Sequence, residues 1–358
     1  MAGSATHGGV TAGLLIGLPG LSRSSRCGDT RPLTSTGDRT LPTTCVCPRT
    51  SGRRAATFLL LTALGLLAAC GKHPPADLPG ASSEPAEAVR ALAGRLQAND
   101  LSGFARAALP PADYAAMETA WRDGRSRWPI SELPLSTRLP GLLATLSAPD
   151  AEARLQRSFD SQLAGQGADL KSAARSLTLF GAQYLRKQPQ YTTAQRAYYI
   201  AIVKALGNWG THAPLGDRGR ARAALKRLTA SARRTGLYSE ADFSAAGLDG
   251  SLTRLAPFAA DVKAVLGTYD LALDETFADL RTGLVSQKGD VAVVRIEYPL
   301  AGVEIPTTVR LLRRDGHWYP EAFLQEAARV AERADATVER PVEQGMAPAK
   351  AAVPAAGP

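Results

Sequence analysis

Cys70 has the most specific chemical surroundings of any side chain in this sequence, because it ends a short apolar run that follows two arginines. Arg53 and Arg54 precede the apolar residues 55–69, and small residues lead directly into the cysteine. This order is that of an export signal that a signal peptidase cuts before Cys70. The alternatives are a membrane-spanning signal anchor and a buried helix that happens to end in cysteine. The signal anchor needs about 20 apolar residues, and this run is shorter.

The tetrapeptide Leu67-Ala68-Ala69-Cys70 resembles the lipobox of bacterial lipoprotein precursors. In that family the cysteine thiol receives a diacylglyceryl group, the signal peptide is removed, and the new amino terminus is acylated with palmitate or a similar chain. The resemblance implies that Cys70 begins the mature chain and carries this lipid anchor, which holds firmly because it has more than one acyl chain. Enteric lipoproteins retained in the inner membrane favour aspartate after the cysteine. Because Gly71 stands there, we expect the outer membrane facing the periplasm, with the inner membrane as the alternative.

The export signal does not stand at the start of the chain. Residues 1–45 are rich in Gly, Ser, Thr, Arg and Pro and have no amphipathic period. We interpret them as an extension read from a start codon set too far upstream or as a disordered leader, and a small cysteine-paired domain is the alternative. With Val46 as the first residue, the signal peptide 46–69 is 24 residues long, and with Leu41 as the alternative start it is 29, both ordinary lengths.

More than half of the net positive charge of the chain lies before Cys70. Seven of the 42 lysines and arginines and two of the 33 acidic residues precede Cys70, which leaves 35 basic and 31 acidic residues and a net charge of +4. Such a balance gives no reason to expect a nucleic-acid partner. Cys70 is also the only cysteine left in the mature chain, so we expect no disulfide and no cysteine nucleophile.

The mature chain divides into a tether, a helical body, a sheet and a tail. Residues 70–84 are rich in Pro, Ala and Ser and predict a flexible tether. Apolar residues at spacings of three and four predict helices throughout residues 85–283, beginning at Pro85. Residues 341–358 predict a disordered tail.

Residues 284–336 predict an antiparallel sheet followed by a C-terminal helix. Apolar and charged residues alternate around Ile296 and Leu311, and the turn sequence Asp315-Gly316 favours a hairpin. The fold class expected is therefore mainly α, a helical body with a small C-terminal antiparallel β-meander packed on a long helix (α+β). We expect that helix to contain the apolar series Leu266, Tyr269, Leu273 and Phe277.

The closing hairpin 309–319 is similar to the sheet end of the NTF2-like, or cystatin-like, envelope lipoproteins, and residues 96–111 are similar to their opening helices. The resemblance covers about a quarter of the mature chain. The NTF2-like class includes both enzymes and binding modules, so the resemblance implies a fold and no particular activity.

No motif predicts catalysis or metal binding. The sequence lacks the phosphate-binding, nucleophile-elbow and zinc-helix motifs. Of the histidines His73, His212 and His317, the first lies in the tether. The carboxylates Asp270, Asp274 and Glu275 are typical of a solvated helix face. We therefore assign no catalytic, cofactor-binding or metal-ligating residue.

Two groups of side chains are candidates for ligand contact. The first is a basic amphipathic segment that could attract an anionic ligand, and its members are Arg218, Arg220, Arg222, Lys226, Arg227, Arg233 and Arg234. The second is an aromatic set that could line a groove, and its members are Tyr184, Tyr191, Tyr198, Tyr199 and Trp209. For both groups the favoured interpretation is structural: a surface helix for the first and a core for the second.

These observations favour a membrane-anchored envelope lipoprotein that binds or scaffolds and is not an enzyme. Its expected partners are the membrane, through the lipid on Cys70, and an envelope protein or a small ligand. Two alternatives stay open: a hydrolase whose site has no recognisable motif, and a protein that binds peptidoglycan or lipopolysaccharide through the basic segment.

Overall fold

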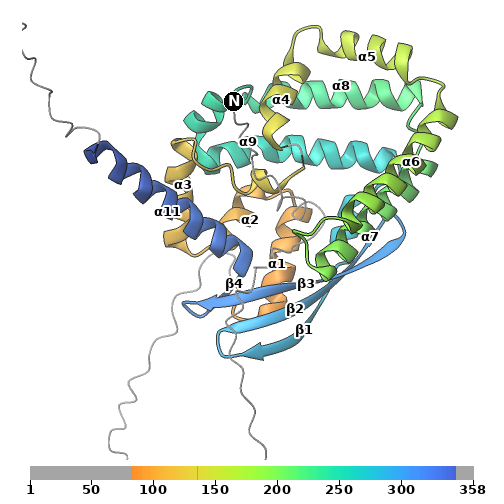
Figure 1. Cartoon of the computed structure of the whole chain (residues 1–358). Coiled ribbons are helices and arrows are strands. Elements are labelled where there is room, and N and C mark those ends of the chain that lie inside the picture. The colour runs from red at the N-terminus through yellow and green to blue at the C-terminus, as the bar shows by residue number, and fades with distance from the viewer. Residues whose placement is uncertain (1–81, 135, 344–358) are drawn as a thin grey trace, which may run out of the picture. The chain divides into compact units, whose positions relative to one another are not determined.

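The computed structural model describes residues 82–134 and 136–343. Cys70, the export signal, the leader and the residues after Glu343 lie outside this part, as does most of the predicted tether. Figure 1 shows the described residues as a set of helices above a small antiparallel sheet. This arrangement confirms the predicted fold class.

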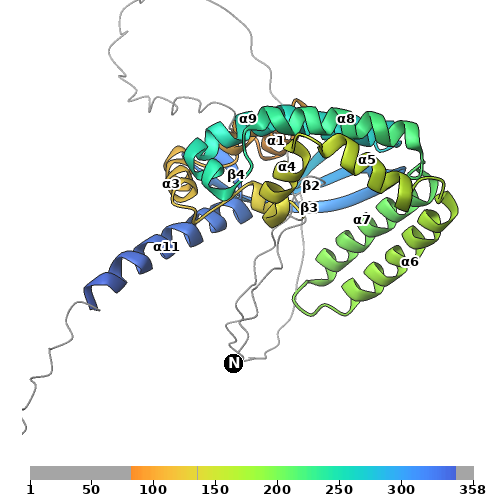
Figure 2. The ribbon, with the colours of Figure 1, turned by 90° about the horizontal axis from the view of Figure 1, so that it is seen from above.

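The helices occupy most of the described chain. Their bounds are α1 Pro85–Gln97, α2 Leu101–Ala107, α3 Pro111–Arg122, α4 Leu139–Ser147, α5 Ala151–Gln162, α6 Gly167–Arg186, α7 Thr193–His212, α8 Arg218–Thr235, α9 Glu240–Thr268, α10 Leu273–Ala278 and α11 Glu321–Glu343, with short 3-10 turns η1 Ile130–Glu132 and η2 Ser136–Arg138. Helices α5, α8 and α9 lie side by side, and α6 pairs with α7 in an antiparallel hairpin (Figures 1 and 2).

The sheet is a simple meander of four strands in the order β1-β2-β3-β4. The strands are β1 Arg281–Lys288, β2 Val291–Leu300, β3 Val303–Arg314 and β4 His317–Pro320. Ala301-Gly302 and Asp315-Gly316 form the two-residue turns that flank β3, and all four residues have positive φ. Such turns suit the twist of antiparallel strands, which explains why the Asp-Gly pair predicted its hairpin correctly.

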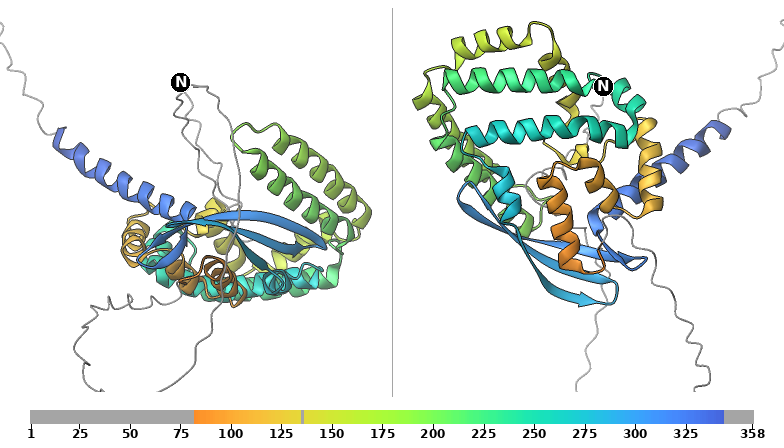
Figure 3. Two further views of the ribbon diagram at one scale, coloured as in Figure 1. Left: turned by 90° about the horizontal axis from the view of Figure 1, so that it is seen from below. Right: turned by 180° about the vertical axis from the view of Figure 1, so that it is seen from behind.

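Three helices cover one face of the sheet and form the first of two cores. Ala292, Val294, Ile296, Tyr298 and Leu300 alternate along β2 and are buried. They pack with apolar side chains of α1, α7 and α10, and the right panel of Figure 3 shows α1 lying across the sheet. The alternation had predicted which side chains of β2 face inward.

The helix expected to carry Leu266, Tyr269, Leu273 and Phe277 is two helices. Helix α9 ends at Thr268, Asp270 has a φ of 65°, and α10 begins at Leu273. Leu273 and Phe277 of α10 belong to the sheet core, whereas α9 contributes only the partly buried Leu266 to it. The apolar spacing continues across the break, which is why the sequence predicted one helix.

The second core joins the N-terminal helices to the C-terminal one. Trp121 and Trp128 are fully buried there, together with Phe243 of α9 and Phe323 of α11. Trp128 and Phe323 meet edge to face, with ring centroids 5.4 Å apart. Helix α11 is therefore attached to the body by its first turns.

Three predicted boundaries shift by a few residues. The carbonyl oxygens of Ser82 and Ser83 accept hydrogen bonds from the backbone and indole N–H groups of Trp318, at 3.0 and 2.9 Å, so the end of the predicted tether is docked on β4. Strand β1 begins at Arg281, inside the predicted helical body. Helix α11 runs to Glu343, so residues 341–343 of the predicted tail are helical.

Candidate binding groove between helix α7 and strand β3

Strand β3 has a free edge along two thirds of its length. Strand β4 is short and pairs only with residues 311–314, so residues 303–310 have β2 as their single strand neighbour in the described part of the chain. Two-residue turns close both hairpins of β3. Val303, directly after the first turn, therefore bonds to Leu300 of β2, and every second residue after it also faces β2. The N–H and C=O groups of the even-numbered residues consequently point away from β2. Thr308 and Arg310 thus present unpaired backbone groups at this edge.

Pro306 interrupts the row of donors on the free edge. Proline has no N–H, and within sheets it is confined to edges and bulges because it cannot donate to a ladder. Its even position matches that rule, since Pro306 pairs with Glu297 of β2 without needing an N–H on that side. The edge therefore offers acceptors at Pro306, Thr308 and Arg310 and donors at the last two.

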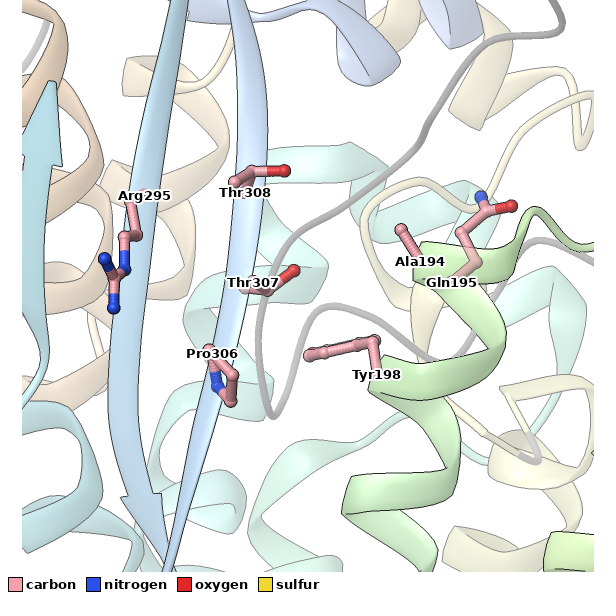
Figure 4. Close-up of a pocket in the computed structure, with 7 residues that line it drawn as sticks. All are labelled: Ala194, Gln195, Tyr198, Arg295, Pro306, Thr307 and Thr308. Atoms are coloured by element: carbon pink, nitrogen blue, oxygen red, sulfur yellow. The ribbon is translucent and has the colours of Figure 1, made fainter. Parts of the chain in front are cut away.

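Helix α7 faces this edge and encloses a pocket with it. Figure 4 shows Ala194, Gln195 and Tyr198 on the first turns of α7, opposite Pro306, Thr307 and Thr308 of β3. The pocket has a volume of about 270 Å³ and opens to solvent. Its walls are thus one helix turn and the edge of a sheet.

A capping box fixes the helix side of the pocket. The hydroxyl of Thr192 accepts a hydrogen bond from the Gln195 N–H at 3.2 Å, and the Gln195 carboxamide oxygen accepts one from the Thr192 N–H at 2.9 Å. This reciprocal pair satisfies two backbone groups at the start of α7 and holds the Gln195 side chain in one orientation. The pocket wall is therefore preorganised on this side.

The polar groups of the pocket are neutral hydrogen-bonding groups. The hydroxyls of Thr307 and Thr308 point toward α7 in Figure 4 and make no hydrogen bond within the described residues. Arg295 of β2, at the rim, points away from α7 and pairs with Glu297. Such a lining can bind by hydrogen bonds and apolar contact, and it offers no nucleophile with an adjacent base.

Tyr198 lines the pocket and ties α7 to the sheet. Its hydroxyl oxygen lies 3.0 Å from that of Tyr298 on β2, 100 residues later in the chain. Burial raises the pKa of both phenols above the usual value of 10. Both side chains therefore stay protonated at neutral pH and act as donors and acceptors, not as bases.

A partly buried carboxyl group, that of Glu132, lies close enough to Tyr199 to affect its pKa. Burial, reinforced by the charge of Glu326 and opposed by Arg329, raises the pKa of Glu132 in η1 to about 7. The charge of Glu132 in turn adds to the effect of burial and of Tyr191 on Tyr199, whose pKa rises to about 12. No sequence pattern marked Glu132, because Glu326 is distant in the chain.

Most basic side chains of the predicted segment on α8 form ion pairs or hydrogen bonds within the fold. Arg227 and Arg234 both pair with Asp261 of α9, at 2.8 and 3.0 Å. Arg233 donates to the carbonyl oxygens of Ser147 and Ala148 at the end of α4. Five of the seven residues thus have internal partners, including Arg218 with Asp160 and Arg220 with the Thr268 carbonyl.

The remaining two side chains of that segment, Arg222 and Lys226, are exposed on α8 and have no ion pair with any described residue. One helical turn separates them. The structural interpretation of the segment therefore accounts for five of its seven side chains, and contact of the segment with an anionic ligand stays a prediction.

The aromatic set is also mostly structural. Tyr199 is buried and stacks obliquely on Tyr191, with ring centroids 5.1 Å apart, and the Trp209 indole N–H donates to the Tyr269 carbonyl oxygen at 2.6 Å. Only Tyr198 lines the pocket. Tyr184 lies on the outer side of α6 and is 56% exposed.

The other candidate side chains are dispersed. His317 is buried at the start of β4, His212 is exposed at the end of α7, and Asp274 pairs with Lys263. Among residues 82–134 and 136–343 no three His, Cys, Asp or Glu side chains come together as metal ligands. Nor is any helix in these ranges long and apolar enough to cross a membrane.

Of the residues that line the pocket, two carry a local signal in the sequence, Gln195 and Pro306. Gln195 follows Thr192 by three residues, which is the spacing of a capping box, and Pro306 interrupts a strand pattern, which indicates an edge. Neither signal indicated that the two would face each other.

No protein-family model, no curated protein sequence and no solved structure matches this chain. The lipobox assignment of Cys70 and the likeness of the closing hairpin to NTF2-like lipoproteins stay predictions from the sequence.

Proposed function

We propose that this chain is a lipid-anchored protein of the bacterial envelope whose role is binding, and that it holds an extended segment of a partner protein against the free edge of β3. The observation that carries the proposal is the unpaired backbone of residues 303–310 beside the α7 pocket. An extended peptide can add a strand to such an edge, its main chain supplying affinity and pockets for alternate side chains supplying specificity.

The pocket lies where a side chain of the added strand would point. Thr307 and Thr308 provide hydroxyl groups, while Ala194 and Pro306 provide apolar contact. A volume of about 270 Å³ suits one or two side chains and is small for a drug-sized ligand. These dimensions favour a peptide over a larger small molecule.

The other outer strand is less suited to the same role. Strand β1 carries an irregularity in its pairing between Leu284 and Ser286, and Arg281 and Lys288 stand at its ends. Bulges and charged side chains are the devices that keep exposed edges from pairing. The edge of β3 is regular in its pairing with β2 throughout.

The anchoring half of the proposal rests on Leu67-Ala68-Ala69-Cys70. In the native host, an alkyne fatty acid should label the wild-type chain, and Cys70→Ser should remain unlabelled. Equal labelling of the serine variant would exclude Cys70 as the lipidated residue.

The binding half is tested by photo-crosslinking from the groove. A photoreactive amino acid at Thr308 should capture one linear segment of an envelope protein, which mass spectrometry of the adduct would locate. The same amino acid at Arg222 of α8 serves as the control and should capture nothing at comparable yield. Capture from Val285 of β1 and not from Thr308 would assign the binding to the other edge.

Two substitutions at one position separate backbone from side-chain recognition. Thr308→Pro removes an N–H that points away from β2, so the hairpin keeps its ladder while the donor to the added strand is lost. Thr308→Val keeps the N–H and removes the hydroxyl. Strand addition predicts loss of capture at a neighbouring photoreactive site with proline and retention with valine. Equal loss with both variants would indicate recognition by the hydroxyl instead.

A further inference from the structure

Helix α6 carries the largest group of exposed apolar side chains in the described chain. Leu177, Leu179, Phe180 and Tyr184 are 68%, 74%, 69% and 56% exposed. The rings of Phe180 and Tyr184 stack on each other, with centroids 6.3 Å apart and planes inclined by 22°. Clustered apolar exposure of this kind marks an interaction site, whereas single exposed residues do not.

These side chains cannot turn inward, because small residues fill the inner side of α6. Thr178 sits against Gly207 of α7, where an added methyl group would overlap it, and Ala174 lies close to Gly210, where an added Cβ would be 3.2 Å from the Ala174 Cβ. The two helices are consequently in close contact along that side. Leu177, Phe180 and Tyr184 follow one another at spacings of three and four, which places them in one stripe beside the contact with α7.

The stripe is left exposed by the other described elements of the fold. Helix α6 packs mainly on α7, and in Figures 2 and 3 it is the outer helix of a hairpin that projects past the sheet. A flat surface could therefore reach α6 without meeting the helical body first.

The hairpin is also strongly basic. Residues 167–212 contain one acidic side chain, Asp169, and six basic ones, which gives a net charge of +5; the basic residues are Lys171, Arg175, Arg186, Lys187, Arg196 and Lys204. All but Arg196 are exposed. An exposed apolar stripe among basic side chains is the composition of helices that lie in the interface of an anionic membrane.

We propose that α6 docks on an anionic phospholipid surface, with Leu177, Phe180 and Tyr184 entering the boundary between headgroups and acyl chains and the basic side chains meeting the lipid phosphates. A second copy of the chain is a poorer occupant, because it would bring an equal positive charge against this one. Docking of α6 needs no lipid on Cys70. Where that lipid is present, Ser82 lies 12 residues after Cys70 and therefore at most about 40 Å from it, which keeps α6 near the membrane.

The test uses the chain from Gly71 onward without lipid, which retains both cores because their members lie within residues 88–330. It is mixed with vesicles of phosphatidylcholine alone or with added phosphatidylglycerol at about 0.15 M salt, the physiological ionic strength. The proposal expects sedimentation with the anionic vesicles and at least tenfold less with the neutral ones. Absence of binding to the anionic vesicles would overturn it.

Three double variants locate the contact. Leu177→Ser with Phe180→Ser should lower the partition coefficient about tenfold or more, since each exposed apolar side chain loses part of its transfer free energy. Arg186→Gln with Lys187→Gln should lower it several-fold and weaken its dependence on salt. Leu284→Ser with Val285→Ser removes comparable apolar surface from β1 and should leave it unchanged; equal loss in this control would overturn the assignment to α6.

Two further readouts complete the test. Phe180→Trp should show a blue-shifted emission on addition of anionic vesicles, because its ring leaves water. A wild-type chain that forms a dimer by light scattering, and that becomes monomeric with Leu177→Ser and Phe180→Ser, would assign the stripe to a second copy and overturn the lipid proposal. All variants must keep the wild-type circular dichroism spectrum, and Phe180→Tyr replaces the serine at that position if they do not.

Discussion

The Nζ atom of Lys263 lies 2.8 Å from the carbonyl oxygen of Gln97, so a lysine of α9 closes the C-terminal end of α1. It also donates to the Leu96 carbonyl oxygen at 3.1 Å and pairs with Asp274 of α10. Its side chain is only 7% exposed and lies over the ring of Phe277. One cation thus joins three helices, at the end of a helix dipole that favours positive charge.

Replacing Lys263 with methionine should destabilise the fold by about 2 kcal/mol, because two buried carbonyl oxygens lose their donor. Urea unfolding followed by circular dichroism measures the difference. Asp274→Asn is the matched control: Asp274 is largely exposed, so its substitution should cost less than about 1 kcal/mol. Equal losses for the two variants would show that the ion pair, and not the capping of α1, carries the effect.

Around Lys263 the sequence predicted the helix itself better than the break between α9 and α10. Leu252 and Leu255 follow a clear helical period, and their burial in α9 agrees with it. The break after Thr268 depends on the backbone of Asp270, which adopts a positive φ although it is not a glycine. Local pattern specifies which face of an element is apolar, whereas this break follows from docking α10 against the sheet.

The α7 pocket could not be predicted for a related reason. Gln195 and Thr308 are more than a hundred residues apart, and each has an ordinary local role, in a helix cap and on a strand edge. Only the packing of α7 on the sheet brings them together. The exposed stripe on α6 could not be predicted either. Phe180 and Tyr184 have the spacing of a buried helix face, and the local sequence does not show that they stay exposed.

Glu132 should make stability depend on pH between about 4.5 and 7. The unfolded chain loses this proton near the usual pKa of 4.5, and the folded chain keeps it to about 7, where burial and the charge of Glu326 outweigh the attraction of Arg329. The folded state therefore binds more protons in this window, and the free energy of unfolding falls as pH rises. The contribution is fully present below pH 4.5 and lost above 7.

Glu132→Gln removes that dependence without changing the shape of the side chain. We expect the variant to resemble wild type at pH 4.5 and to melt at a higher temperature than wild type at pH 8. Differential scanning fluorimetry across this range measures the difference, with Glu152→Gln on the surface of α5 as the control. A constant offset between Glu132→Gln and wild type at every pH would contradict the assignment.

Asp261 should matter more to folding than Arg222 and Lys226, the two basic side chains of α8 that pair with no described residue. It is 18% exposed and accepts from both Arg227 and Arg234, so Asp261→Asn weakens two ion pairs and should cost about 1 kcal/mol. Arg222→Gln with Lys226→Gln should change the free energy of unfolding by less than about 0.5 kcal/mol. Urea unfolding at low and high salt compares them, and the loss from Asp261→Asn should shrink as salt increases.

The strictest test of the sheet core compares two neighbouring residues of β2. Ile296 is 1% exposed and faces α1 and α7, whereas Arg295 points to the opposite side and is exposed. Ile296→Asp places a carboxylate in the apolar layer without a partner, and we expect it to abolish cooperative unfolding or to drive the chain into aggregates. Arg295→Ser should fold like wild type, since strand alternation puts its side chain on the open face. A cooperative thermal transition of Ile296→Asp within a few degrees of wild type would mean that the helices do not bury this face of the sheet.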